Sequence, residues 1–137
     1  MRVIVFHYHL LPGGVTDVIV HSLEALCTYR RDITEVRLVA GRADNGVRIV
    51  ERLDRLEVPV SLDVIDELGY TDPGEPTEEA LARATSIEKK LTELYGDDAL
   101  WWVHNYHLGK NPSFTLALCR IADLDAAPLM LLHIHDF

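Results

Sequence analysis

Short apolar runs alternate with segments of helical periodicity along the whole chain, and this alternation constrains the fold more than any other feature. The runs are Val3–Phe6, Glu35–Ala40, Val58–Ile65, Ala99–Val103 and Leu129–Ile134. Each is short, apolar and rich in β-branched or aromatic residues, as strands buried on both faces of a parallel sheet are. The repeated strand-then-helix order predicts right-handed crossovers between parallel strands.

The segments between the runs carry apolar residues at the three-four spacing of amphipathic helices. The expected helices cover the stretch from Val15 to just before Arg30, Val47–Leu56, the stretch from Pro76 to Gly96, and Pro112–Ile121. The Gly- and Pro-containing stretch Asp66–Thr77 is predicted to be an exposed loop. Together these elements predict an α/β fold, a three-layer Rossmann-like parallel sheet with a strand order of about 3-2-1-4-5.

Length and charge limit the function classes. At 137 residues and 48% hydrophobic composition, residues 1–137 are expected to form one compact domain. The net charge of −9 disfavours nucleic acid and anionic membrane surfaces as partners. There is no apolar stretch near the ~20 residues of a membrane span, and the run Val3–Phe6 is too short for a signal peptide. The sequence therefore predicts a cytoplasmic protein without a transmembrane segment.

The end of the chain and the cysteines give two further expectations. The chain stops at Phe137, directly after the fifth run, with no helix to cover that strand, which favours a fragment of a longer enzyme. Cys27 and Cys119 each lie in an apolar helical segment, which favours buried free thiols over a disulfide.

Six of the seven histidines follow or close the predicted strands. They are His7, His9, His104, His107, His133 and His135. In an open parallel sheet, ligands bind at the carboxyl ends of the strands, so these histidines are expected at a shared binding edge. Because side chains alternate along a strand, His133 and His135 should share one face, as should His7 and His9. Each could instead be a structural histidine, and the clustering favours a site.

Gly13 and Gly14 lie between the first strand and the first helix. Missing side chains there let backbone N–H groups and the helix N-terminus approach an anion such as a phosphate. The two glycines can also simply be the turn that starts the helix. The segment contains neither Gly-x-Gly-x-x-Gly nor a Walker loop, so NAD binding and ATP hydrolysis are disfavoured as functions.

Three segments carry a resemblance to a known family: His9 to Val20, His104 to Pro112 and His133 to Phe137. In order and spacing they resemble the first loop and helix, and the fourth and fifth strand ends, of the group 1 retaining glycosyltransferases of GT-B fold. The resemblance implies that the chain is the N-terminal, acceptor-side half of a two-domain enzyme that moves a sugar from a nucleotide-sugar with retention.

The resemblance also implies roles for individual residues. His135 would contact the transferred sugar as the catalytic histidine, and Gly13 and Gly14 would approach the donor diphosphate. The acceptor side of the cleft would be lined by His9, Asn105, His107, Lys110, His133 and Asp136. No metal and no cofactor are implied, because the nucleotide-sugar is the donor substrate and a small molecule or glycan is the acceptor.

One departure from the family pattern matters more than the matches. The family carries two glutamates, with seven residues between them, in its C-terminal donor-binding domain. Glu67 and Glu75 have that separation but fall in the acidic loop of this chain, which we interpret as a coincidence. The donor-binding domain is therefore missing, and the chain alone is expected to be inactive.

Two other function classes compete. Strand-end His-x-His pairs with Asp136 could supply Zn²⁺ or Mn²⁺ ligands in a metal-dependent hydrolase, although the glycine pair then has no role. A response-regulator-type module would need an acidic cluster after the first strand, where this chain has histidines. Both are less well supported than glycosyl transfer.

Overall fold

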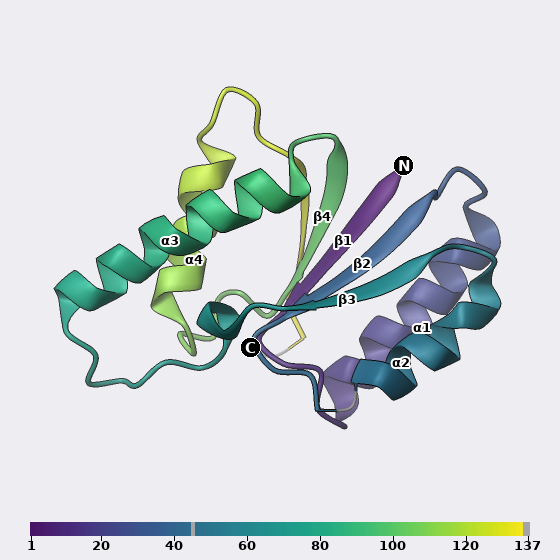
Figure 1. Cartoon of the computed structure of the whole chain (residues 1–137), viewed down its shortest axis with the longest axis horizontal. Helices are drawn as coiled ribbons and strands as arrows, with labels where there is room; N and C mark the ends of the chain where they lie inside the picture. Colours follow the sequence, from purple (N-terminus) through teal and green to yellow (C-terminus); the bar gives the residue numbers. More distant parts are fainter. Residues whose placement is uncertain (45, 136–137) are drawn as a thin grey trace.

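The fold is known from a computed structural model that describes residues 1–44 and 46–135. Within these residues five parallel strands form one sheet in the order β3-β2-β1-β4-β5 (Figure 1). The strands are β1 (Arg2–His7), β2 (Glu35–Ala40), β3 (Val60–Val64), β4 (Ala99–His104) and β5 (Leu129–His133). The α/β class, the parallel arrangement and the strand order predicted from the sequence are confirmed.

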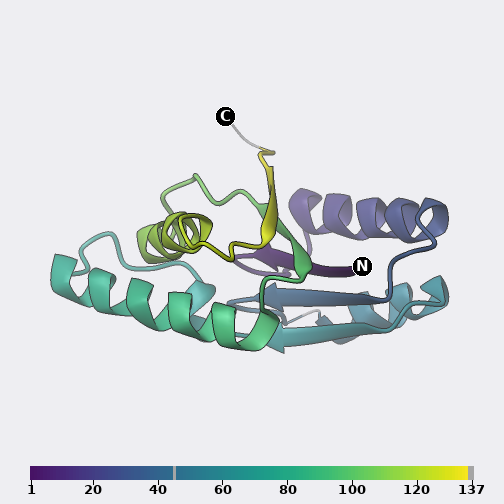
Figure 2. The same ribbon diagram turned by 90° about the horizontal axis from the view of Figure 1, so that it is seen from above.

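Helices cover both faces of the sheet (Figures 1 and 2). They are α1 (Gly14–Tyr29), α2 (Gly46–Leu53), α3 (Thr77–Tyr95) and α4 (Pro112–Ala122). The buried side chains of α1 and α2 pack with Val3 and Val5 of β1, whereas those of α3 and α4 pack with Ile4 and Phe6. The alternation of side chains along one buried strand thus supplies two separate cores.

The adjacent tryptophans of β4 follow the same rule. Trp101 belongs to the core under α3 and α4, and Trp102 belongs to the core under α1. Both side chains are buried, at 0% and 7% exposure. One ring therefore lies on each face of the sheet.

Several boundaries differ from the sequence-based expectation. The helix expected over Val47–Leu56 ends at Leu53 and continues as the 3-10 turn η1 (Asp54–Leu56). The strand expected over Val58–Ile65 is limited to β3, and the Pro59 carbonyl accepts a hydrogen bond from the Val36 N–H at 2.9 Å. Proline lacks an N–H for the ladder, so the regular strand begins after it.

The stretch Asp66–Thr77 is not simply an exposed loop. It begins with the 3-10 turn η2 (Asp66–Leu68), and Leu68 is fully buried in the core under α3 and α4. The side-chain amide of Asn111 donates to the carbonyl oxygens of Glu67 and Gly69, both at 2.7 Å. These bonds fix the turn against the start of α4, a contact between segments far apart in the sequence.

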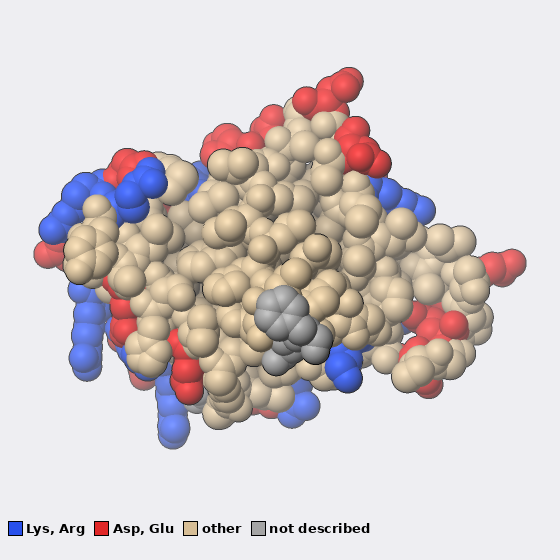
Figure 3. All heavy atoms as spheres, turned by 180° about the vertical axis from the view of Figure 1, so that it is seen from behind, with Lys and Arg blue, Asp and Glu red and all other residues tan. Residues whose placement is uncertain are grey.

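Strand β5 differs from the central strands in its exposure. Leu129, Leu131 and Leu132 are 71%, 47% and 44% exposed. On the side of the molecule opposite to the view of Figure 1, where β5 lies, the described residues show a broad area without Lys, Arg, Asp or Glu, which gather toward its rim (Figure 3). These leucines form an exposed apolar surface among the described residues.

The two cysteines have different environments. Cys27 is a buried free thiol, as expected, but Cys119 is exposed, so that part of the prediction is wrong. Cys119 lies in an apolar segment of α4 but on the side of the helix that faces away from the core. The apolar character of the segment had predicted that it would be buried. Among the described residues, none of the helices has the length and apolar character that crossing a membrane requires.

Candidate functional site at the carboxyl edge of the sheet

The carboxyl ends of β1, β4 and β5 bring histidines to one edge of the sheet. His7 ends β1, His104 ends β4 and His133 ends β5, and His104 and His133 are partners in the parallel register. His104 follows Trp102 by two residues, so both side chains point to the face that α1 covers. The sequence-based expectation of a histidine-rich edge is confirmed in its location.

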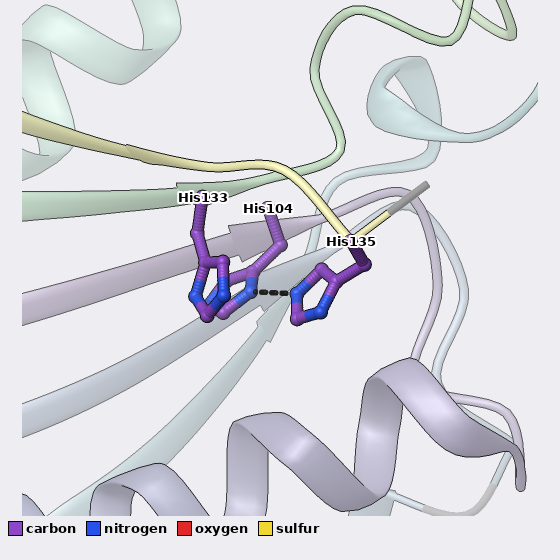
Figure 4. A group of neighbouring side chains, drawn as sticks. All are labelled: His104, His133 and His135. Atoms are coloured by element: carbon purple, nitrogen blue, oxygen red, sulfur yellow. Dashed lines mark hydrogen bonds between the residues drawn. The ribbon is translucent and has the colours of Figure 1, made fainter. Parts of the chain in front are cut away.

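Three of the rings form a compact group, His104, His133 and His135, which we call the histidine cluster (Figure 4). The ring centroids of His133 and His135 are 4.1 Å apart with planes at 21°, and those of His104 and His135 are 5.0 Å apart at 15°. Nδ1 of His104 lies 2.7 Å from Nε2 of His135, a hydrogen-bonding distance. The rings therefore stack, and one hydrogen bond joins His104 to His135.

Burial keeps the central ring of the cluster uncharged. His104 is 0% exposed. Loss of hydration, and then the nearby rings of His133, His135 and His7, lower the pKa of His104 to about 3. At neutral pH His104 is a neutral imidazole, with one N–H and one lone pair.

Asn105 joins the ends of β4 and β5 through its backbone and its side chain. Its N–H donates to the carbonyl oxygen of His133 at 2.9 Å, and its Oδ1 accepts from the N–H of His135 at 2.9 Å. Asn105 has a φ of 54°, in the left-handed region that Asn tolerates better than most residues. This conformation turns the chain away from β4 and leaves the side chain facing β5.

The predicted anion loop lies at the start of α1. Gly13 is the N-cap residue and Gly14 is the first residue of the helix. Both are exposed, and a side-chain carbon added to either would meet no atom within 4 Å. The first N–H groups of a helix have no partner inside it, so this end offers donors and free space to an anion.

A second part of the edge centres on Tyr70, which follows η2. The Tyr70 hydroxyl lies 3.3 Å from Nε2 of His9, and the two rings meet edge to face with centroids 5.5 Å apart. Burial, and then the charge of Arg42, lower the pKa of His9. The His9 ring is also 5.0 Å from the His7 ring, so it connects Tyr70 to the histidines at the strand ends.

Two hollows flank Tyr70. The larger, of about 560 Å³, is lined by Tyr8, His9, Leu11, Gly41, Arg42, Asp66, Gly69 and Tyr70. The smaller, of about 360 Å³, lies between the η2–α3 loop and the β4–α4 loop and includes Lys110. Nζ of Lys110 is 5.7 Å from the centre of the Tyr70 ring. An aromatic ring between two hollows, with Lys110 beside it and Arg42 lining the larger hollow, can hold a polar ligand of sugar size.

The sequence-predicted residues do not all come together. His133, His135 and Asn105 meet at the β4–β5 ends, His9 and Lys110 lie beside Tyr70, and His107 is exposed with its ring against Tyr106. Asp136 falls outside the described residues.

Sequence reasoning placed His104 at the binding edge without giving it a role, and it did not select Tyr70 or Arg42 as site residues. His104 was recognisable by its position at a strand end. Tyr70 and Arg42 gave no signal, because only the turn at η2 and the loop after β2 bring them beside His9.

The histidine cluster also has the composition of a metal site, since the three rings each offer a nitrogen within 4.8 Å of the others. Its geometry is not that of a preformed tetrahedral centre. Zinc-bound nitrogens lie about 3.3 Å apart, given Zn–N bonds of about 2.0 Å, whereas two nitrogens here are 2.7 Å apart. Each lone pair also lies in its ring plane, and near-parallel stacked rings do not aim their lone pairs at one point.

Comparisons with known proteins give one similarity over almost the whole chain. Neither a protein-family model nor a solved structure matches. The chain is 33% identical over 136 residues to mannosylglucosyl-3-phosphoglycerate synthase of Petrotoga mobilis, an alignment that covers 97% of this chain and 25% of that protein. The chain thus spans about a quarter of the length of the relative it matches.

Proposed function

We propose that this chain is the acceptor-side domain of a retaining glycosyltransferase of GT-B fold, which moves a sugar from a nucleotide-sugar to an acceptor. The observation that carries the proposal is the similarity along 97% of the chain to a synthase of mannosylglucosyl-3-phosphoglycerate. The name of that product contains two sugars, and joining sugars requires formation of a glycosidic bond. The parallel sheet and the strand-end histidines agree with such a role without being specific to it.

The edge of the sheet supports a division of roles. We assign His135 to contact with the transferred sugar, and Gly13 and Gly14 to the donor diphosphate. The free space at the start of α1 and the helix N-terminus suit an anion. In this account no metal is needed, because backbone donors and the helix dipole stabilise the leaving diphosphate.

The acceptor is proposed to bind beside Tyr70. The hollows there present an aromatic ring, the imidazole of His9 and the cations Arg42 and Lys110. We assign Asn105, His107, His133 and Asp136 to the remaining acceptor side of the cleft. Lys110, and Arg42 with its ion-pair partner Asp44, would face the phosphate or carboxylate of such an acceptor, as in the phosphoglycerate part of the relative's product.

The donor is proposed to bind mainly to a second domain of the same enzyme. The exposed leucines of β5 support this arrangement, because an uncovered apolar strand is normally packed against a further element. This chain by itself is therefore expected to bind donors weakly and to be inactive.

Saturation-transfer NMR on the chain tests the proposal. We expect sugar protons of glucosides and of 3-phosphoglycerate-bearing glucosides to be saturated, and nucleotide-sugars to give weak or no signals. Tyr70→Ala should abolish the acceptor signals, whereas Tyr29→Ala, a matched change of a tyrosine 83% exposed on α1, should leave them unchanged. Acceptor signals that survive Tyr70→Ala, or no sugar signals at all, would count against the proposed acceptor role.

The composition of the histidine cluster favours one second candidate, a metal-dependent hydrolase. Elemental analysis of the purified chain and titration with Zn²⁺ test it. Stoichiometric metal that is lost in His133→Asn would support the hydrolase. The stacked geometry leads us to expect substoichiometric metal and weak Zn²⁺ binding.

A further inference from the structure

His104 is a buried polar group of the site to which the proposed function gives no role. Its Nδ1 contacts Nε2 of His135 at 2.7 Å. Its Nε2 is buried and has no hydrogen-bond partner among the described residues. Buried polar atoms without partners are uncommon in folded proteins, so this one calls for a physical reason.

The position of the proton on His104 follows from this arrangement. One hydrogen must lie between the two nitrogens of the short contact. If His135 donated it, a neutral His104 would carry its own proton on Nε2, as a buried N–H without an acceptor. If His104 donates from Nδ1, only a lone pair is left unpaired. Orphaned buried N–H groups are the rarer of the two, so the Nδ1–H form of His104 is favoured.

The same hydrogen bond then determines which ring nitrogen of His135 carries the proton. Its Nε2 accepts from His104, so a neutral His135 carries its proton on Nδ1 and can donate to a ligand only through that nitrogen. The ring orientation is held independently. The N–H of His135 donates to Asn105, and its ring stacks on His133, which in turn lies parallel to Trp102 at 4°.

We propose that His104 is a positioning residue, which donates from Nδ1 to Nε2 of His135 and so fixes both the orientation and the tautomer of that ring. The inference rests on the proposed function for its catalytic meaning, because His135 is the residue assigned to the transferred sugar. The arrangement is analogous to an outer partner that sets the tautomer of a working histidine. His104 itself touches no substrate.

The ionisable groups that face His104 are consistent with a neutral donor. They are His133 at the end of β5, His135 two residues later, and His7 at the end of β1. A positive charge on His104 would be repelled by each of these rings when it is protonated. The pair therefore works as a neutral donor and a neutral acceptor.

Long-range ¹H–¹⁵N NMR of the histidine-labelled chain at neutral pH tests the inference. In the unaltered chain, His104 should show a protonated Nδ1 and a bare Nε2, and His135 a bare Nε2 and a protonated Nδ1. This spectrum alone decides the tautomers, even if a variant fails to fold. A proton on Nε2 of His104 would overturn the proposal.

Variants then test whether His104 is the cause. His104→Phe keeps a flat ring but has no donor, so His135 should lose its single tautomer. His104→Asn places an amide N–H near the position of Nδ1 and should restore it. His21→Gln, an exposed histidine of α1, is the matched control and should change nothing. An unchanged His135 in His104→Phe would overturn the proposal, as would Zn²⁺ binding at one equivalent that shifts all three rings of the histidine cluster.

These NMR samples contain no sugar, so the spectra test the positioning role of His104 separately from the proposed function. The wrong tautomers would remove the positioning role and leave glycosyl transfer standing. The expected tautomers together with absent acceptor signals in the saturation-transfer experiment would count against the proposed function alone.

Discussion

Nδ1 of His104 and Nε2 of His135 are 2.7 Å apart, so a side-chain hydrogen bond ties the last described residue to the end of β4. Asn105, the next residue, ties the same two segments through the backbone N–H of His135. Adjacent residues at one strand end thus hold both the backbone and the ring of His135. The edge of the sheet is shaped by polar contacts between strand ends, whereas its centre is shaped by apolar packing.

Burial of His104 predicts a stability that falls in mild acid. Its pKa is lowered to about 3 in the folded chain from an ordinary 6.5, so between these values the unfolded chain binds the extra proton. The contribution of neutral His104 to the free energy of unfolding is fully present above pH 6.5. It is lost as the pH falls toward 3, by up to about 1.4 kcal/mol per pH unit.

Urea unfolding between pH 7 and pH 5 measures this loss, in a range above the titration of most carboxylates. His104→Phe should flatten the pH dependence relative to the unaltered chain. An equal slope in both proteins would show that His104 is not held neutral by the fold.

Substitution by alanine should have a large effect on stability at Gly41 and a small one at Gly14. A side-chain carbon at Gly41 would lie 2.0 Å from the backbone nitrogen of Gly69, whereas one at Gly14 would meet nothing within 4 Å. Because backbone cannot move aside cheaply, Gly41→Ala should cost about 3 kcal/mol or more of the free energy of unfolding. Gly14→Ala should stay within about 1 kcal/mol of the unaltered chain. Thermal unfolding of the two variants checks this, and equal effects would contradict the close approach of Gly41 to Gly69.

Asn111 should be sensitive to the loss of its amide donors. Its Oδ1 caps α4 by accepting from the Phe114 N–H at 2.9 Å, and its amide donates to the carbonyls of Glu67 and Gly69. Asn111→Ser keeps a cap acceptor but no amide, and should cost about 1–3 kcal/mol. Asn111→Asp keeps the cap and places a carboxylate against two carbonyl oxygens, so it should cost more than Asn111→Ser at pH 7. Urea unfolding gives the order, and a more stable Asp variant would contradict these contacts.

The sequence was sufficient for the layers, because they depend on periodicity within single segments. The strand order followed from the usual topology of a doubly wound sheet. Val3 and Val5 alternate with Ile4 and Phe6, and that pattern needs no knowledge of the rest of the chain. The histidine-rich edge was predictable for the same reason, since the carboxyl ends of parallel strands meet.

Contacts between distant loops were not predictable. The burial of Leu68 and the position of Tyr70 depend on the Asn111 amide, which lies more than forty residues away in the sequence. The central place of His104 depends on the parallel register that sets it opposite His133. Periodicity carries no information about either relationship. The prediction for Cys119 was wrong because an apolar helix still has an outer face.

Glycosyl transfer itself is measured most directly on the protein encoded by the complete reading frame to which this chain belongs. The protein is supplied with a panel of nucleotide-sugars and phosphorylated or carboxylated sugar acceptors, and release of nucleoside diphosphate is followed together with the anomeric configuration of the product. We predict release that requires an acceptor, retains the donor's configuration, survives metal chelation and falls at least about a hundredfold in His135→Ala. No release with any nucleotide-sugar, or turnover that chelation abolishes and His135→Ala leaves unchanged, would contradict the account.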